Sequence, residues 1–395
     1  MFMSLCAHSV SPHLHMLRSV GYCRLSANAA PRRKAVHRVY HSFTLFVTCT
    51  YVLQQSIYAF QERNNLDKVT QVMFVMLCYG TCAVKQIAFY LKAGKIDDLI
   101  ARLHDPLMNH GSCGSRALLR HTARSAARLL HVFSSCAVCT VVLWSAFPLL
   151  YWLKGLDVEF RFWTGCSYDT SLRFYVVLLY SFYVSTMGAL GQTSMDAFIA
   201  TILNVCISQL QILRINFELL PEKAVALSKE TDEEYNAALH RLLVDCLVHY
   251  QKITEMCALL NDIFSVPLLV QLGISAWILC MAAYEIVDLN VASVEFASTT
   301  LFIVCILIEL LLFCYYGTLV TFESDRVEEA IYNMEWFRTP VWFQRSLLVV
   351  MERAKRPLRP TAGHVMPLSL VTFVTILKSS YSFYAVLRQT KETKN

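Results

Sequence analysis

Residues 293–322 read SVEFASTTLFIVCILIELLLFCYYGTLVTF, and this stretch decides the class of fold. It contains only two charged side chains, Glu295 and Glu309. It is also longer than the roughly 20 apolar residues that a helix needs to cross a bilayer. Soluble domains keep their apolar runs short. We therefore predict that this stretch crosses a membrane.

The rest of the chain repeats the pattern. Of its 395 residues, 56% are hydrophobic and 16% are charged, and the mean hydropathy is +0.44. Soluble domains carry about 25% charged residues. The composition predicts an all-α membrane protein, a seven-transmembrane helical bundle, with spans near 39–60, 69–91, 129–152, 172–207, 262–285, 293–322 and 364–388. The fourth and sixth blocks exceed one crossing, so their inner ends should continue as helices.

Lys and Arg gather in alternate connections. Residues 1–38 hold six basic side chains and no acidic one, and the connections 92–128 and 323–363 hold seven basic side chains each. The connections between them, 61–68, 153–171 and 286–292, hold two, two and none. Basic segments stay in the cytoplasm. We expect a cytoplasmic N-terminus and an extracellular C-terminus, which excludes a G-protein-coupled receptor because that class has the opposite orientation.

The connection 208–261 carries one apolar stripe. Its apolar residues recur every three or four positions, as on one face of a helix: Leu239, Leu243, Cys246, Leu247, Tyr250, Ile253, Cys257 and Leu260. Such a helix lies on the membrane or packs in a cytoplasmic bundle. Its polar face mixes both signs of charge, which favours the bundle.

Several chemistries find no support in the sequence. Most of the 15 cysteines lie within apolar blocks, where they act as small hydrophobic residues. No pair has zinc-site spacing, and we find no phosphate loop, nucleotide fingerprint or Ser-His-Asp pattern. We expect no enzyme activity, no metal, no cofactor and no nucleic-acid partner. Whether Cys166, in an outer loop, forms a disulfide stays open.

The C-terminal third carries a family signature. It runs through Phe313-Cys314-Tyr315-Tyr316-Gly317, Ser324, Tyr332-Asn333, Trp336, Arg356-Pro357, Gly363, Ser380-Tyr381, Phe383 and Leu387. This succession resembles the insect odorant receptors, and residues 239–253 resemble that family's helix before the fifth span. The Thr-Tyr and Gln-Phe pattern of gustatory receptors is absent, and so is the co-receptor's long insertion before the fifth span. The chain therefore resembles a tuning subunit, with a gustatory-type chemoreceptor channel as the alternative.

The resemblance implies a tetrameric, odour-gated cation channel built with a co-receptor in the plasma membrane of olfactory neurons. Residues 208–261 and 323–363 would form the cytoplasmic anchor, the span 364–388 would line the pore, and 389–395 would be a short extracellular tail. Val386, Leu387 and Gln389 would then lie at the constriction, where an apolar ring excludes water and ions. The alternative is that Val386 and Leu387 face lipid.

The family's ligand site lies between spans two, three, four and six. A small, volatile, apolar odorant needs a pocket of aromatic and Met side chains with an occasional hydroxyl. Our candidates are Met73, Met76, Tyr79, Trp144, Phe147, Tyr151, Tyr183, Met187, Phe296 and Thr300. For each of them, ordinary helix packing is the alternative.

Ionisable groups inside spans suggest function. We expect Lys85 to reach the inner interface as an anchor and Asp196 to be solvated at the inner mouth of its helix. Glu309 and Lys378 lie deeper, so we expect them to pair and to couple span six to span seven. Gly188 and Gly191 should permit a close approach between helices.

Overall fold

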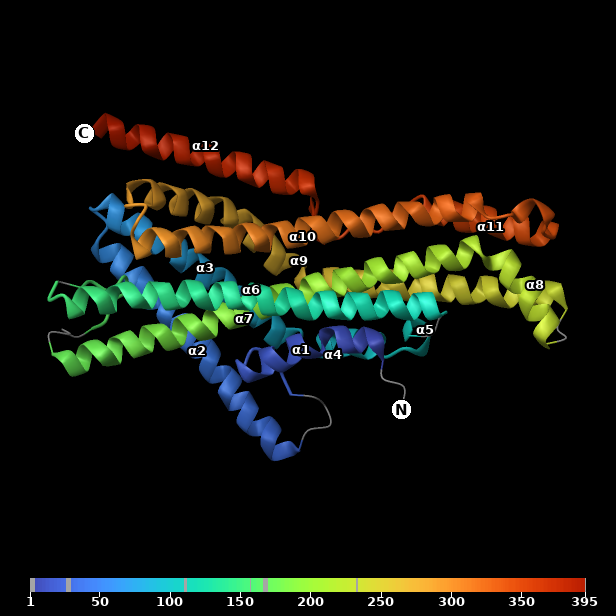
Figure 1. Cartoon of the computed structure of the whole chain (residues 1–395), viewed down its shortest axis with the longest axis horizontal. Coiled ribbons are helices and arrows are strands. Elements are labelled where there is room, and N and C mark those ends of the chain that lie inside the picture. The colour runs from blue at the N-terminus through green and yellow to red at the C-terminus, as the bar shows by residue number, and fades with distance from the viewer. Residues whose placement is uncertain are drawn as a thin grey trace.

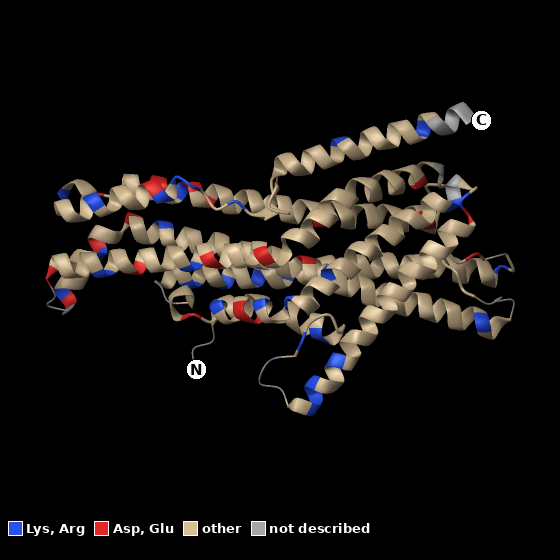
Figure 2. Ribbon diagram, turned by 180° about the vertical axis from the view of Figure 1, so that it is seen from behind, with Lys and Arg blue, Asp and Glu red and all other residues tan. Residues whose placement is uncertain are grey.

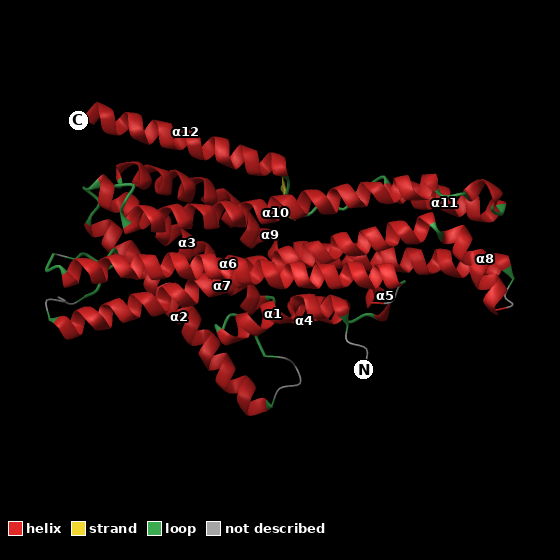
Figure 3. Cartoon of the chain, in the orientation of Figure 1, coloured by secondary structure: helices red, strands yellow, loops and turns green. Residues whose placement is uncertain are grey.

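The computed structural model describes residues 4–25, 30–109, 112–156, 158–165, 170–231 and 234–394. Cys166 lies outside these residues. The described chain is almost entirely helical (Figures 1 and 3). Its elements are α1 Leu5–Ser19, α2 Pro31–Gln61, α3 Leu66–Leu91, α4 Ala93–Leu103, α5 Pro106–Asn109, α6 Cys113–Leu153, α7 Ser171–Glu218, α8 Leu220–Thr231, α9 Tyr235–Asp288, α10 Val294–Asn333, the 3-10 turn Trp336–Arg338, α11 Val341–Ala354, β1 Thr361–Ala362, β2 Met366–Pro367 and α12 Leu370–Lys394.

The helices account for the predicted apolar blocks. Within the described residues, six helices are long and apolar enough to cross a membrane: α3, α6, α7, α9, α10 and α12. The first predicted block lies in α2, whose Thr, Gln and His residues make it less apolar than the other six. The prediction of a helical membrane bundle is confirmed.

Charged residues are distributed unevenly along the long axis of the bundle. Figure 2 shows many acidic and basic residues in the half that holds α8 and α11, while in the other half they lie mainly in α2 and at the ends of the helices. Four helices, α6, α7, α9 and α10, run from one half into the other (Figure 1). The predicted continuation of the long blocks is thus observed in α7 and α10. The stripe of α9, including Leu239, Ile253 and Leu260, is buried, so it packs in a bundle as expected.

Helix α1 was not predicted from the sequence. It packs against α6 and α7 and buries Cys6, Val10 and Leu17. The Ser4 side chain caps it by accepting a hydrogen bond from the Ala7 backbone N–H. On the same face His13 is fully buried, and its Nε2 shares a hydrogen bond of 3.1 Å with Thr201 Oγ1 of α7.

This buried histidine predicts a pH dependence of stability. Burial lowers the pKa of His13 from 6.5 to about 4, because the charged imidazole loses its hydration. The unfolded chain takes up this proton near pH 6.5 and the folded chain only near pH 4. Stability should therefore fall by about 1.4 kcal/mol for each pH unit between these values. Thermal unfolding of the purified protein between pH 7.5 and 4.5 measures the effect, and the His13→Gln variant should show a shallower fall. Equal slopes would contradict it.

A short hairpin sets the position of α12. In β1 and β2, Ala362 pairs with Met366, and the turn uses Gly363 at φ +62°. The Gly363 N–H donates to the Ser265 carbonyl of α9, which fixes the hairpin to the bundle. The predicted last span began at residue 364, but the helix begins at Leu370 because the hairpin occupies 361–367. Beyond it, α12 contacts α9 and α10 and leaves most of its surface exposed (Figure 1).

Candidate functional site

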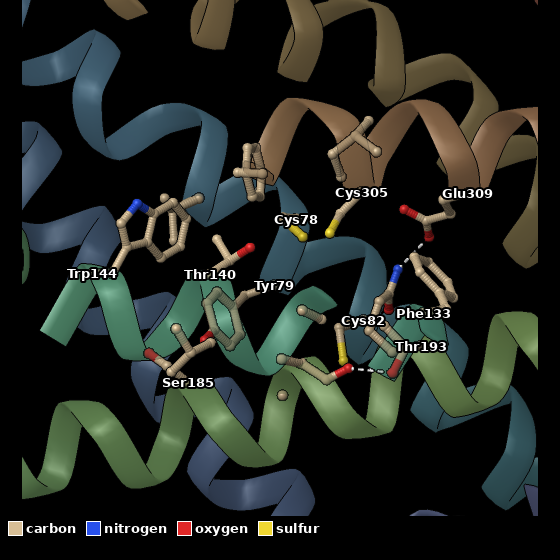
Figure 4. Close-up of a pocket in the computed structure, with 18 residues that line it drawn as sticks. Cys78, Tyr79, Cys82, Phe133, Thr140, Trp144, Ser185, Thr193, Cys305 and Glu309 are labelled. Carbon is tan, nitrogen blue, oxygen red and sulfur yellow. Dashed lines mark hydrogen bonds between the residues drawn. The ribbon is translucent and has the colours of Figure 1, made fainter. Parts of the chain in front are cut away.

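A cavity of about 80 Å³ lies between α3, α6, α7 and α10, the helices of the predicted second, third, fourth and sixth spans. Most of its wall is apolar. The lining residues are Val75, Cys78, Tyr79, Cys82, Phe133, Ala137, Thr140, Val141, Trp144, Ser185, Gly188, Ala189, Gln192, Thr193, Phe302, Cys305, Ile306 and Glu309. Figure 4 shows Trp144 and Glu309 at opposite ends, so one end of the cavity is aromatic and the other is acidic.

Aromatic rings close the first end. Trp144 and Phe302 lie with their ring centroids 5.3 Å apart, and Phe302 contacts the buried Phe74 at 5.2 Å. Along the wall, Tyr79 packs edge-on against Tyr51 at 4.9 Å. Such edge-to-face pairs are stabilising and hold both rings in one orientation.

Two glycines of α7 make room for tyrosine rings. A Cβ at Gly188 would lie 2.6 Å from Tyr79 Cε1, and a Cβ at Gly191 would collide with the Tyr22 ring. We expected these glycines to permit close approach of helices. They permit the close approach of two side chains. The missing Cβ atoms leave space for the Tyr79 ring of α3 and the Tyr22 ring of the segment after α1.

A buried charge cluster closes the second end. The Lys85 Nζ of α3 lies 2.5 Å from Asp196 Oδ1 of α7 and 2.9 Å from Glu309 Oε1 of α10. The exposed fractions of the Lys85 and Asp196 side chains are 1% and 0%. Glu309 Oε1 also accepts hydrogen bonds from Gln192 of α7, at 2.6 Å, and from Gln271 of α9. Four helices thus meet through one set of charged and amide groups.

The cluster corrects three expectations. Lys85 is buried and paired, so it does not reach the interface as an anchor, and Asp196 is not solvated. Glu309 pairs with Lys85, whereas Lys378 is exposed on α12 and does not meet Glu309 within the chain. Hydropathy places a residue along its helix but not around the helix axis, and the orientation around the axis decides which charges meet.

Four of the ten candidate ligand residues line one of three cavities in the described structure, and six do not. Tyr79 and Trp144 line the central cavity, and Phe147 and Tyr151 line cavities beside it. The other six do not line these three cavities of the described structure: Met73, Met76, Tyr183, Met187, Phe296 and Thr300. Tyr183 is exposed on the outside of the bundle. On α10 the cavity meets Phe302 and Cys305, farther along the helix than Phe296 and Thr300.

A second cavity of about 90 Å³ adjoins the first and shares Val75, Trp144 and Ser185 with it. The loop residues 159–162 cover its other side. Ion pairs hold this loop, since Glu159 lies 2.8 Å from Lys68 Nζ and Arg161 lies 2.8 Å from Glu285. Trp144 is therefore part of the partition between the two cavities.

The candidate pore residues lie near the end of α12. The side chains of Val386 and Gln389 are exposed, with 62% of Val386 accessible, and Leu387 is half-buried. Farther back on the helix, Phe383 stacks on Trp277 of α9 at 4.7 Å between ring centroids. This part of α12 thus presents apolar side chains away from its own bundle.

Some residues of the site escaped the sequence reasoning. Phe302, Cys78 and Thr140 look like ordinary span residues, and no spacing distinguishes them. Gln192 and Gln271 did carry a signal. An amide in an apolar span needs a buried partner, and a search for amides would have led to Glu309.

Comparisons with known proteins agree on one family. The family model described as 7tm Odorant receptor matches residues 65–381. The chain is 24% identical to Odorant receptor 85b of Drosophila melanogaster over 85% of this chain and 86% of the relative. It is 22% identical to Odorant receptor 85c of the same fly over 84% of each. The olfactory receptor OR5 of Machilis hrabei, solved in complex with eugenol, shares the fold with a TM-score of 0.84 at 15% identity, covering 96% of this chain and 97% of that one.

Proposed function

Because the chain belongs to the insect odorant receptor family, and is therefore a multi-pass membrane receptor for odorants rather than an enzyme, we propose that it is the odour-binding subunit of a heteromeric, non-selective cation channel. Its partner would be the family's co-receptor, in a tetramer in the plasma membrane of olfactory neurons. The observation that supports the proposal most is the cavity that four spans enclose beside a buried charge cluster.

The odorant would bind in this central cavity. Burial against Trp144, Phe302 and Val75 would supply most of the binding free energy, at about 25 cal/mol per Å² of apolar surface. The related receptor OR5 is described in complex with eugenol, a small aromatic compound. The cavity here is smaller than the ~150 Å³ that admits benzene. Binding would therefore displace lining side chains, and that displacement is a route to gating.

The gating signal would travel along α10. This helix lines the cavity with Phe302 and Glu309, and its Thr318 Oγ1 accepts a hydrogen bond from the Leu370 N–H at the start of α12. A shift at the cavity would thereby move α12, which we propose lines the pore with Val386, Leu387 and Gln389 at the constriction. The N-terminus and the charged half of the bundle, including 208–261 and 323–363, would face the cytoplasm. The C-terminus would be outside.

Expression in a cell that lacks other odorant receptors tests the proposal. We expect cation current in response to a panel of odorants when the chain is expressed with the co-receptor, and no current when it is expressed alone. Current in response to sugars or bitter compounds without the co-receptor would favour a gustatory-type channel instead. Surface labelling must be equal in both cases.

Replacing the partition residue should change the size of ligand accepted. Trp144→Ala should join the two cavities, so odorants with two additional methylene groups should gain about tenfold in potency relative to wild type, at about 0.8 kcal/mol per buried methylene. Half-maximal concentrations for a homologous series measure this. The control is Trp152→Ala, because Trp152 stacks on Phe174 at 4.2 Å and lies outside the walls of the described cavities. The same shift in both variants would contradict the prediction.

A further inference from the structure

The acidic end of the cavity holds a hydrogen-bond acceptor that has no donor bound to it. Gln192 lines the cavity, is buried, and donates from its Nε2 to Glu309 Oε1 at 2.6 Å. A carboxylate oxygen only accepts hydrogen bonds, so the amide must turn its nitrogen to Glu309. The other amide atom, Gln192 Oε1, is buried and has no hydrogen-bond partner among the described residues.

A buried acceptor without a partner is costly. Leaving such a group unpaired destabilises by about 1–3 kcal/mol. An ester, ketone, aldehyde or ether brings only acceptors and cannot relieve this cost. A hydroxyl or an amine brings a donor and can bond to Gln192 Oε1.

The charge of the cluster also favours a ligand that donates a hydrogen bond or carries a positive charge. One ammonium, of Lys85, meets two carboxyls, of Asp196 and Glu309, so the ionised cluster has one excess negative charge. A buried excess charge is unfavourable until a proton or a cation balances it. Glu309 lines the cavity, which places part of that excess where a ligand head group can reach it.

We propose that the receptor selects small odorants with one hydrogen-bond-donating head group, an alcohol or a protonated amine, on a short apolar body. The head group donates to Gln192 Oε1, and the body extends toward Trp144 and Phe302. In Figure 4 this direction runs from Glu309 to Trp144. This selectivity rests on the proposed odour-binding function and assigns the chemical class of ligand to that site.

The test measures binding to the purified full-length receptor in lipid nanodiscs, with no need for current. The ligands are 1-hexanol, hexylamine, hexanal and methyl pentyl ether, which match in length and differ in the head group. We expect Kd values for at least one of the two donors about tenfold or more below those for the aldehyde and the ether. Hexanol against hexylamine separates a neutral donor from a cationic one. Equal Kd values for all four compounds, tighter binding of the aldehyde or ether, or no binding of either donor at millimolar concentration would overturn the proposal.

A matched pair of variants locates the effect. Gln192→Met removes the acceptor, so the preference for donors should shrink to less than about threefold while hexanal binds as before. Gln271→Met removes the other amide that bonds to Glu309, but Gln271 lies outside the cavity wall, so the preference should remain. Loss of the preference in both variants, or in neither, would overturn the assignment to Gln192. If the chain binds donors yet yields no odour-gated current with the co-receptor, the channel proposal fails and the ligand class stands.

Discussion

The Lys85→Met variant should fail to reach the cell surface. Lys85 is the ammonium between two carboxyls in the middle of the bundle, and the exposed fraction of its side chain is 1%. Its removal leaves Asp196 and Glu309 buried side by side without a counter-ion. Breaking a buried ion pair from one side costs about 3–5 kcal/mol, a large part of the roughly 5–15 kcal/mol that stabilises a typical protein. Surface labelling and the thermal unfolding midpoint of the detergent-solubilised protein measure the loss.

Two comparisons give this prediction its specificity. Removing all three charges together, in Lys85→Met with Asp196→Asn and Glu309→Gln, should recover much of the surface expression, because no uncompensated charge is left in the bundle. Lys95→Met breaks an exposed pair with Asp262 and should cost less than about 1 kcal/mol. A triple variant that expresses no better than Lys85→Met would show that charge balance is not what the cluster provides.

The Gly317→Ala variant should lose most of its odour-gated current. A Cβ at Gly317 would overlap the backbone carbonyl oxygen of Leu368, next to the hairpin that leads into α12. Alanine favours a helix over glycine by about 1 kcal/mol, so propensity alone predicts a gain in stability. Overlap with a backbone atom outweighs this gain, since relieving it costs about 1–3 kcal/mol and requires the hairpin and the start of α12 to move. Maximal current, normalised to surface protein, should fall at least about tenfold.

The chain supplies a matched control for this substitution. Gly273 lies within α9, and a Cβ there has no neighbouring heavy atom within 4 Å among the described residues. Gly273→Ala should leave the current unchanged or raise expression slightly. Adding Leu368→Ala to Gly317→Ala should not restore the current, because the nearest overlap is with the carbonyl oxygen. Restoration by this second change would mean that the side chain of Leu368, rather than the backbone, sets the position of α12.

Properties that act along one helix were predictable from the sequence. Apolar length alone identified the blocks that became α3, α6, α7, α9, α10 and α12. Periodicity identified the buried stripe of α9, because a face that repeats every three or four residues has to pack against something. The family resemblance pointed to the four helices that enclose the cavity, and two of its ten candidate residues, Tyr79 and Trp144, line it.

Properties that depend on how helices turn toward one another were not predictable. We expected Glu309 to meet Lys378, but the rotation of α10 in the bundle turns Glu309 toward Lys85. The hairpin at 361–367 was missed because β1 lies just before the predicted last block and β2 lies inside it, and strands of two residues leave no periodic pattern. Helix α1 was missed because the basic residues of the N-terminal segment were interpreted only as a signal for its side of the membrane. They did not suggest a helix that packs against the bundle.

A cryo-electron microscopy structure of the receptor with the co-receptor and an activating odorant would show directly where the odorant binds. We expect ligand density between Tyr79, Trp144 and Phe302, with the Trp144 and Phe302 rings displaced from their present contact at 5.3 Å. Density in the cavity that Phe147 and Tyr151 line, with the central cavity unchanged, would place the odorant elsewhere and contradict the proposed site.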